Sequence, residues 1–269
     1  MKWIFTLAII ISPVLITGCN IDSLKPDKSK EPAEIVDISR KSIQVGTTTR
    51  YEVVFTTTLD GRSVEQVSLD TITYSAVYQL PNEYGYQDPE GGPFLEVTSK
   101  NSRTSGMLTS YINPKGSLAL SVDSDTYSTK EDIVYDSERD QLSNSYTLGK
   151  SYNVIDSQKR HSIYNHNEVS NTQGVSTYTP RAVEIIVTES GSYNTLKIDY
   201  SNETSIQFSN GTSEVRTVSG SQWLDIASGA LIKMSASGVA ENSEYDEAIR
   251  FHYTRLHVGN ITPIKTIEP

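Results

Sequence analysis

Hydrophobic and polar residues alternate over many short segments of the chain. Val183, Ile185 and Val187 occupy every second position of one segment, and residues 196–200 continue the alternation after the turn sequence Ser190-Gly191-Ser192. Because successive side chains of a strand point to opposite faces, this pattern predicts a hairpin with one buried face. The alternating apolar residues of both segments are therefore expected to face the core.

A second hairpin is predicted around Asn210-Gly211, between apolar segments that end at Phe208 and resume at Val215. This dipeptide is a strong short-range hairpin signal, because both central residues of a type I′ turn need positive φ. The other strands predicted in this half are 223–224 and 231–234, which a glycine turn at 227–229 connects, and 248–258.

The first half of the chain has a similar composition, with a proline- and glycine-rich loop at 88–93 that excludes a helix. Its strand-like segments are 50–59, 68–80, 94–98, 107–112, 117–122 and 133–135. No window of about fifteen residues keeps an apolar helical stripe with capping residues. The predicted fold class is mainly β, an antiparallel meander that forms one curved sheet or an open barrel with few helices.

The N-terminus has a different pattern, with Lys2 followed by an apolar run from Trp3 to Ile16 and then the small pair Thr17-Gly18. This order of parts is typical of a signal peptide. A membrane-spanning helix needs about 20 apolar residues, so the run is too short to be retained as a span.

The segment Leu15-Ile16-Thr17-Gly18-Cys19 resembles the lipobox of bacterial lipoproteins, with an aliphatic residue three positions before the cysteine and a small one directly before it. The resemblance implies cleavage between Gly18 and Cys19 and lipid attachment to the Cys19 thiol, with acyl chains such as palmitate. Asn20, where inner-membrane lipoproteins have Asp, implies the outer membrane, facing the periplasm. The alternatives are an outer-membrane lipoprotein that faces the cell surface, or a host with a single membrane.

Cys19 is the only cysteine of the chain, so no disulfide is expected in an exported protein that could use one. The alternative is an ordinary secretory peptide with an incidental buried cysteine. The predicted organisation is a signal peptide at 1–18, a flexible tether at 19–35, an antiparallel β domain at 36–262 and a C-terminal tail at 263–269. After removal of residues 1–18, 22 basic residues face 33 acidic ones, a net charge of −11 that argues against nucleic acid as a partner.

Residues able to carry chemistry form no recognisable set. His161 and His166 are five positions apart, as are His252 and His257, a spacing that points the two rings of each pair to opposite faces of a strand. The acidic residues at 123–125 and 131–132 lack the third oxygen ligand and the glycine of a calcium loop. No nucleophile or nucleotide motif is present, so no catalytic residue, metal site or cofactor is predicted.

Tyrosine is in excess, with 16 residues against 5 phenylalanines. A concave surface could use tyrosines to bind sugars, peptides or amphiphiles. Tyrosine also suits half-buried sheet positions, and this second explanation is preferred.

One weak resemblance extends over residues 146–236. It is carried by Leu148-Gly149-Lys150-Ser151-Tyr152, the glycine-turn strand 191–198 and the tryptophan strand that returns through a glycine turn. This order is similar to uncharacterised periplasmic and lipoprotein β domains, and it implies a fold loosely like the half-barrels of lipoprotein carriers. Such domains imply no activity.

The leading functional hypothesis is a non-enzymatic, membrane-anchored envelope lipoprotein whose curved β domain binds an envelope protein or a small amphiphilic ligand. The first alternative is a structural or interaction lipoprotein without a pocket, for which long unpaired strand edges would be the sign. The second is an envelope hydrolase with a dispersed site, which needs a histidine, a serine and a carboxylate in one cleft.

Overall fold

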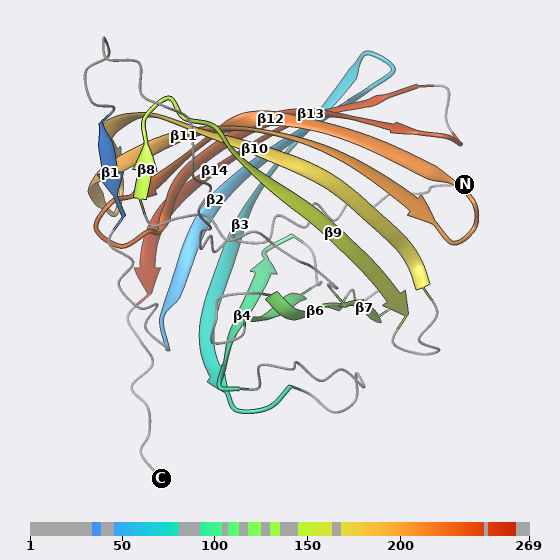
Figure 1. Ribbon diagram of the computed structural model, residues 1–269, viewed down its shortest axis with the longest axis horizontal. Coiled ribbons are helices and arrows are strands. Elements are labelled where there is room, and N and C mark those ends of the chain that lie inside the picture. Colours follow the sequence, from blue (N-terminus) through green and yellow to red (C-terminus); the bar gives the residue numbers. More distant parts are fainter. Residues whose placement is uncertain are drawn as a thin grey trace, which may run out of the picture.

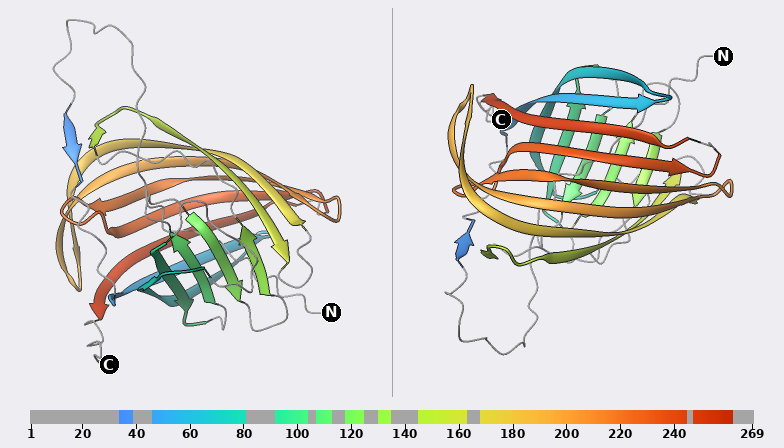
Figure 2. Two further views of the ribbon diagram at one scale, coloured as in Figure 1. Left: turned by 60° about the horizontal axis from the view of Figure 1, so that its bottom comes forward. Right: turned by 90° about the horizontal axis from the view of Figure 1, so that it is seen from above.

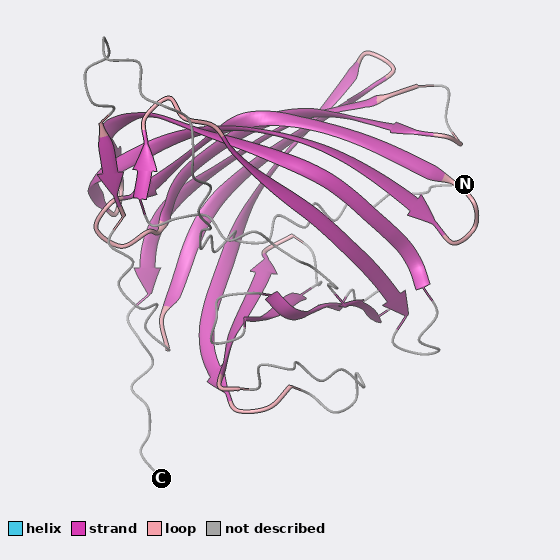
Figure 3. Cartoon of the chain, viewed as in Figure 1, coloured by secondary structure: helices cyan, strands magenta, loops and turns pink. Residues whose placement is uncertain are grey.

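The computed structural model describes residues 34–38, 46–80, 92–103, 107–112, 118–124, 130–134, 145–162, 168–244 and 247–261. The predicted cleavage site at Gly18 and Cys19, most of the tether, the C-terminal tail and His166 lie outside these ranges. Within them every regular element is a strand (Figure 3).

The strands follow the chain closely and are joined by short turns in the second half. They are β1 (Ile35–Asp37), β2 (Thr48–Leu59), β3 (Arg62–Val77), β4 (Phe94–Asn101), β5 (Met107–Ile112), β6 (Leu118–Ser124), β7 (Lys130–Val134), β8 (Ser145–Thr147), β9 (Tyr152–Ser162), β10 (Glu168–Thr188), β11 (Gly191–Phe208), β12 (Ser213–Asp225), β13 (Leu231–Asn242) and β14 (Ile249–Ile261).

All strands except β1 and β8 belong to one antiparallel ring in the order β10-β11-β12-β13-β14-β2-β3-β4-β5-β6-β7-β9. The long strands β10 to β14 form one curved wall, and the shorter strands β4 to β7 lie across from them (Figures 1 and 2). Pairing of β7 with β9 over four residue pairs completes the ring, so its closure depends on one short ladder. The mainly β, antiparallel and strongly curved fold is confirmed.

Most predicted strands are present, and β5 has the predicted bounds. Strands β1, β8 and β9 and the first half of β10 were not predicted, although β9 and β10 pair from Glu168 to Tyr178. The first half of β10 lacks hydrophobic alternation because polar residues occupy its buried positions. Ser170, Thr172 and Ser176 are all buried.

The turn chemistry differs from the prediction at one hairpin. Between β11 and β12 only Gly211 has positive φ, and the Asn210 side chain accepts a hydrogen bond from the backbone N–H of Thr212 at 3.0 Å. The hairpin is therefore confirmed but the type I′ turn is wrong. Positive φ at both central residues, which that turn type needs, occurs instead at Asp60 (52°) and Gly61 (69°), between β2 and β3.

The hairpin of β10 and β11 is confirmed, but the expectation that Val183, Ile185 and Val187 face the core is wrong. All three side chains are exposed. The register shifts between Pro180 and Ala182, and β9 pairs with β10 only as far as Tyr178. Beyond that point the hairpin extends past its neighbour, so the alternation is retained without a core beneath it.

Buried side chains form two clusters that contact each other through shared neighbours. One lies where β1 and β8 pack on the ring and includes Val36, Ile38, Tyr146, Val154, Tyr178, Leu196, Ile198 and Leu224. The other lies between the long wall and the short strands and includes Tyr51, Val53, Ile72, Val97, Ile112, Met234, Ala236 and Tyr253. Tyrosines contribute to both, and Tyr51, Tyr146, Tyr178 and Tyr253 are buried rather than half-buried.

Candidate functional site

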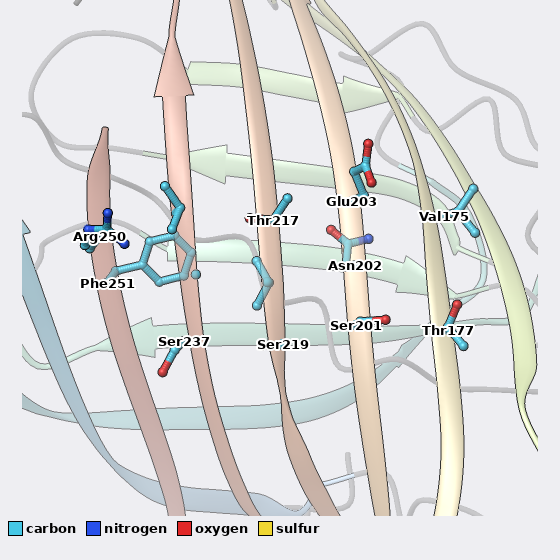
Figure 4. Close-up of a pocket in the computed structure, with 13 residues that line it drawn as sticks. Val175, Thr177, Ser201, Asn202, Glu203, Thr217, Ser219, Ser237, Arg250 and Phe251 are labelled. Carbon is cyan, nitrogen blue, oxygen red and sulfur yellow. The ribbon is translucent and has the colours of Figure 1, made fainter. Parts of the chain in front are cut away.

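A hollow of about 630 Å³ lies on the wall formed by β10 to β14 (Figure 4). Each of these five strands contributes to it. The lining residues are Val175, Thr177, Ser201, Asn202, Glu203, Thr217, Val218, Ser219, Ser237, Gly238, Val239, Arg250 and Phe251.

Strand register arranges most of the lining in two rows that run across the wall. One row, called here the hydroxyl row, consists of Thr177, Ser201, Ser219 and Ser237, each directly opposite the next, and it ends at His252. Neighbouring positions are about 4.8 Å apart, the ordinary distance between strands. The parallel row contains Val175, Glu203, Thr217, Val239 and Arg250.

The opposite face of the same strands packs toward the core. Val218 contacts the second core cluster, and Phe251 is buried. A Cβ added at Gly238 would lie 2.4 Å from Cζ of Phe251, and one at Gly220 would lie 2.2 Å from the carbonyl oxygen of Ser235. Glycine is required at both positions because the curved strands and the Phe251 ring approach the backbone so closely.

The chemistry of the hollow is that of a neutral, hydrogen-bonding surface. Serine and threonine hydroxyls can donate and accept. The Asn202 amide is engaged within the protein, because it donates to the Ser176 hydroxyl and accepts from the Thr204 hydroxyl. Glu203 and Arg250 carry opposite charges three strands apart, on the order of 14 Å at ordinary strand spacing. This arrangement suits a ligand with many hydroxyl groups better than a compact ion.

A serine and a histidine meet at one end of the hydroxyl row. The Ser237 hydroxyl and Nδ1 of His252 are hydrogen-bonded at 2.8 Å, and both residues are exposed. Within the described ranges no carboxylate is bonded to the His252 ring. In the described part of the chain, Ser237 and His252 are therefore not joined by the carboxylate that the hydrolase alternative needs.

A second polar group of residues lies inside the ring, where an arginine and an aspartate form an ion pair. Nη2 of Arg255 is 3.2 Å from Oδ2 of Asp70, and their side chains are 4% and 17% exposed. The guanidinium also lies over the Tyr51 ring, 4.2 Å from its centroid. Asn101 donates to Oδ1 of Asp70 at 2.8 Å, so the carboxylate is held from two sides.

Burial dominates the electrostatics of this interior pair. Desolvation raises the pKa of Asp70 above its ordinary value, although Arg255 and the hydrogen bond from Asn101 lower it. Burial likewise raises the pKa of Tyr51 and Tyr200, and it raises that of Tyr253 to about 12. Nε of Arg255 has no hydrogen-bond partner in the described part of the chain.

The histidines of the second predicted pair lie on opposite faces, as their odd spacing predicted. His252 is exposed, whereas His257 is buried with its Nδ1 2.9 Å from the Ser190 hydroxyl. The His257 ring meets Tyr51 and Tyr193 edge-on. In the described ranges no three histidine, cysteine, aspartate or glutamate side chains gather as a metal site would require.

The acidic segment singled out from the sequence forms the hairpin of β6 and β7, in which Asp123 is opposite Glu131 and Val122 is opposite Asp132. Asp125 lies outside the described residues. The hollow was not predicted, because the Ser and Thr residues of its hydroxyl row come from four different strands. Only the strand register could have brought them together.

Comparison with known proteins gives two weak structural similarities. A lipoprotein from Parabacteroides distasonis matches with a TM-score of 0.37 and 13% identity, over 84% of this chain and 99% of that one. An exported protein with a YmcC-like fold from Bacteroides fragilis matches with a TM-score of 0.28 and 10% identity, over 84% of this chain and 100% of that one. No family model and no curated protein matches the chain.

The described ranges contain no helix long and apolar enough to cross a membrane.

Proposed function

We propose that this protein is a non-enzymatic lipoprotein, anchored through Cys19 in the outer membrane and facing the periplasm, whose β domain binds a saccharide chain in the hollow of β10 to β14. The observation that carries the proposal is the hydroxyl row beside Glu203 and Arg250. The lipobox supports the anchor, and the segment between Cys19 and the first strand would serve as the tether.

The match to saccharides follows from hydrogen bonding and shape. A sugar presents hydroxyls that both donate and accept, and the hydroxyl row offers the same groups at regular intervals. The hollow is open and most of its polar side chains are exposed to solvent, so the ligand gains little from desolvation and affinity must come from several contacts at once. An extended chain that crosses several strands meets that requirement better than one sugar unit.

Filling the hollow is the direct test of this binding. Ser219→Trp places a large ring in the middle of the hydroxyl row, on an exposed strand position that tolerates it. The protein is first tested on an array of bacterial surface glycans, and the best glycan is then titrated by calorimetry. The variant is expected to bind at least about tenfold more weakly, a loss of about 1.4 kcal/mol.

Ser205→Trp is the matched control, because Ser205 is an exposed serine of β11 that lies outside the hollow. It should bind the glycan as the wild type does. Saccharide binding in the hollow would be refuted if the wild-type protein bound no glycan on the array. It would also be refuted if the Ser219→Trp and wild-type proteins bound the glycan with equal affinity.

The anchor is tested separately by mass spectrometry of the mature N-terminus and by membrane fractionation. Wild-type protein is expected in the outer-membrane fraction with a diacylglyceryl group on Cys19, and the Cys19→Ala variant is expected to be unprocessed or released. Each buried methylene contributes about 0.8 kcal/mol, so two or three acyl chains make the attachment effectively permanent. An unmodified wild-type protein in the soluble fraction would contradict the anchor, but it would not bear on glycan binding in the hollow.

A further inference from the structure

The end of β10 is an unpaired strand edge. Its residues 182–188, called here the β10 edge, pair with β11 on one side, while β9 ends its pairing at Tyr178 on the other. The N–H of Gly149 donates to the carbonyl oxygen of Pro180 at 2.7 Å. The segment that contains Gly149 connects β8 to β9 and does not continue along β10 beyond this point. Among the described residues no strand pairs with the β10 edge on this side.

The backbone of this edge is arranged for pairing. Thr188 and Gly191 close the hairpin as a hydrogen-bonded pair. From there the pairs of the antiparallel ladder alternate, so that every second residue of β10 is in a non-hydrogen-bonded pair with β11. The backbone N–H and C=O groups of Val183, Ile185 and Val187 therefore point away from β11, toward the open side. Such a row of free groups is a template for another strand.

The side chains at these same positions are apolar and exposed. Ile185 is 70% and Val187 is 75% exposed, and Val183 lies on the same face. No charge blocks this face of the edge. Glu184 points to the other face, where its carboxylate accepts a hydrogen bond from Nε1 of Trp223 at 2.9 Å. The usual protections of an edge strand are thus missing from its middle.

We propose that the β10 edge pairs with the β10 edge of a second copy of this chain, antiparallel and centred on Ile185. The segment is self-complementary about that residue. Val183 then lies opposite Val187 of the second copy, Ile185 lies opposite its own counterpart, and all the free backbone groups of the three residues are satisfied. Cross-strand aliphatic pairs of this kind each contribute roughly 0.2–1 kcal/mol.

Charge supports this register and this partner. Pairing about Ile185 brings Arg181, whose Nε also bonds Asp199 of its own chain at 2.7 Å, toward Glu189 in the β10–β11 turn of the second copy. The twofold symmetry repeats this opposite-charge approach at the other end. Such isologous contacts are typical of two-fold homodimers. An arbitrary peptide would satisfy the backbone but would not reproduce both the apolar symmetry and the paired charges. The interface is small, so the association is weak and is best detected by trapping.

Cysteine trapping in the full chain tests the pairing and its register. Directly paired residues have Cα atoms about 5.5 Å apart, within disulfide range. Ile185→Cys is therefore expected to give a disulfide-linked homodimer under mild oxidation, above any background of the wild-type chain. Val175→Cys is the matched control, because Val175 is also exposed on β10 but lies between two paired strands.

Register is tested with the flanking positions. Val183→Cys protein should not link to itself, because four residues along a strand separate the two thiols by about 13 Å. A mixture of Val183→Cys and Val187→Cys proteins should link. Adding Arg181→Glu to Ile185→Cys should slow linkage several-fold, and further addition of Glu189→Arg should restore it.

Two outcomes would overturn the proposal. One is linkage of Ile185→Cys no faster than that of Val175→Cys. The other is self-linkage of Val183→Cys as fast as that of Ile185→Cys, which would indicate random collision. Both results are independent of glycan binding and of lipid attachment, because the β10 edge lies outside the hollow and the wild-type background already contains Cys19.

Discussion

Asp70→Leu is expected to lower the free energy of unfolding by about 3 to 5 kcal/mol, as measured by urea denaturation at pH 7. The substitution leaves the guanidinium of Arg255, which is 4% exposed, without its counter-ion. An uncompensated buried charge is costly because the interior cannot replace its lost hydration. Asn101 also loses the acceptor it donates to, which adds to the effect.

The double variant Asp70→Leu with Arg255→Met should recover most of this loss. The raised pKa of Asp70 shows that burial disfavours its ionised form more than Arg255 and Asn101 favour it. The pair as a whole therefore contributes little net stability, and replacing both charges by apolar groups removes two desolvation penalties together. A double variant as unstable as Asp70→Leu alone would contradict this account.

Arg181→Met is the control for the loss of an ion pair at the surface. Nε of Arg181 donates to Oδ2 of Asp199 at 2.7 Å, but the two side chains are 52% and 37% exposed. Water solvates either charge when its partner is removed, so the expected loss is below about 1 kcal/mol.

The second large effect is expected at alkaline pH, where stability should fall by about 4 kcal/mol per pH unit between pH 10 and pH 12. Burial raises the pKa of Tyr51, Tyr200 and Tyr253 above the ordinary value of 10.0, that of Tyr253 to about 12. Above pH 10 the unfolded chain releases protons that the folded chain retains. The stability is therefore fully present below pH 10 and is lost as pH rises through the folded-state pKa values.

Denaturation with urea at a series of pH values from 9 to 12 measures this slope. Each of the three tyrosines contributes about 1.4 kcal/mol per pH unit, and Tyr74, whose pKa burial also raises, adds to the slope. Tyr253→Phe should therefore reduce the slope by roughly a quarter to a third. Phe55→Leu is the control, since it disturbs the same core without removing an ionisable group. A slope that Tyr253→Phe leaves unchanged would show that other groups govern alkaline unfolding.

Local alternation was enough to predict most strands, because the period of two does not depend on what covers the strand. It failed in two opposite ways on β10. The first half is a strand with buried Ser170 and Thr172, which carry no hydrophobic signal. The second half has the signal, yet Ile185 and Val187 are exposed because the hairpin extends beyond its neighbour.

Turn prediction shows the same division between local and tertiary information. Asn210-Gly211 correctly marked a hairpin, since both residues favour turns whatever the turn type. The conformation was decided by the four residues between β11 and β12 and by the hydrogen bond from Thr212 to the Asn210 side chain. The residues of the interior ion pair, Asp70 and Arg255, carry no sequence signal for their contact.

By itself the sequence determined that this chain is built from antiparallel strands and that His252 and His257 point to opposite faces. These properties depend on residue type and spacing alone. Only the tertiary structure decided which faces are covered, which strands are neighbours and where the open β10 edge lies. The hydroxyl row, the Arg255–Asp70 pair and the exposed Ile185 all depend on strand register and on the extent of neighbouring strands, which long-range pairing sets.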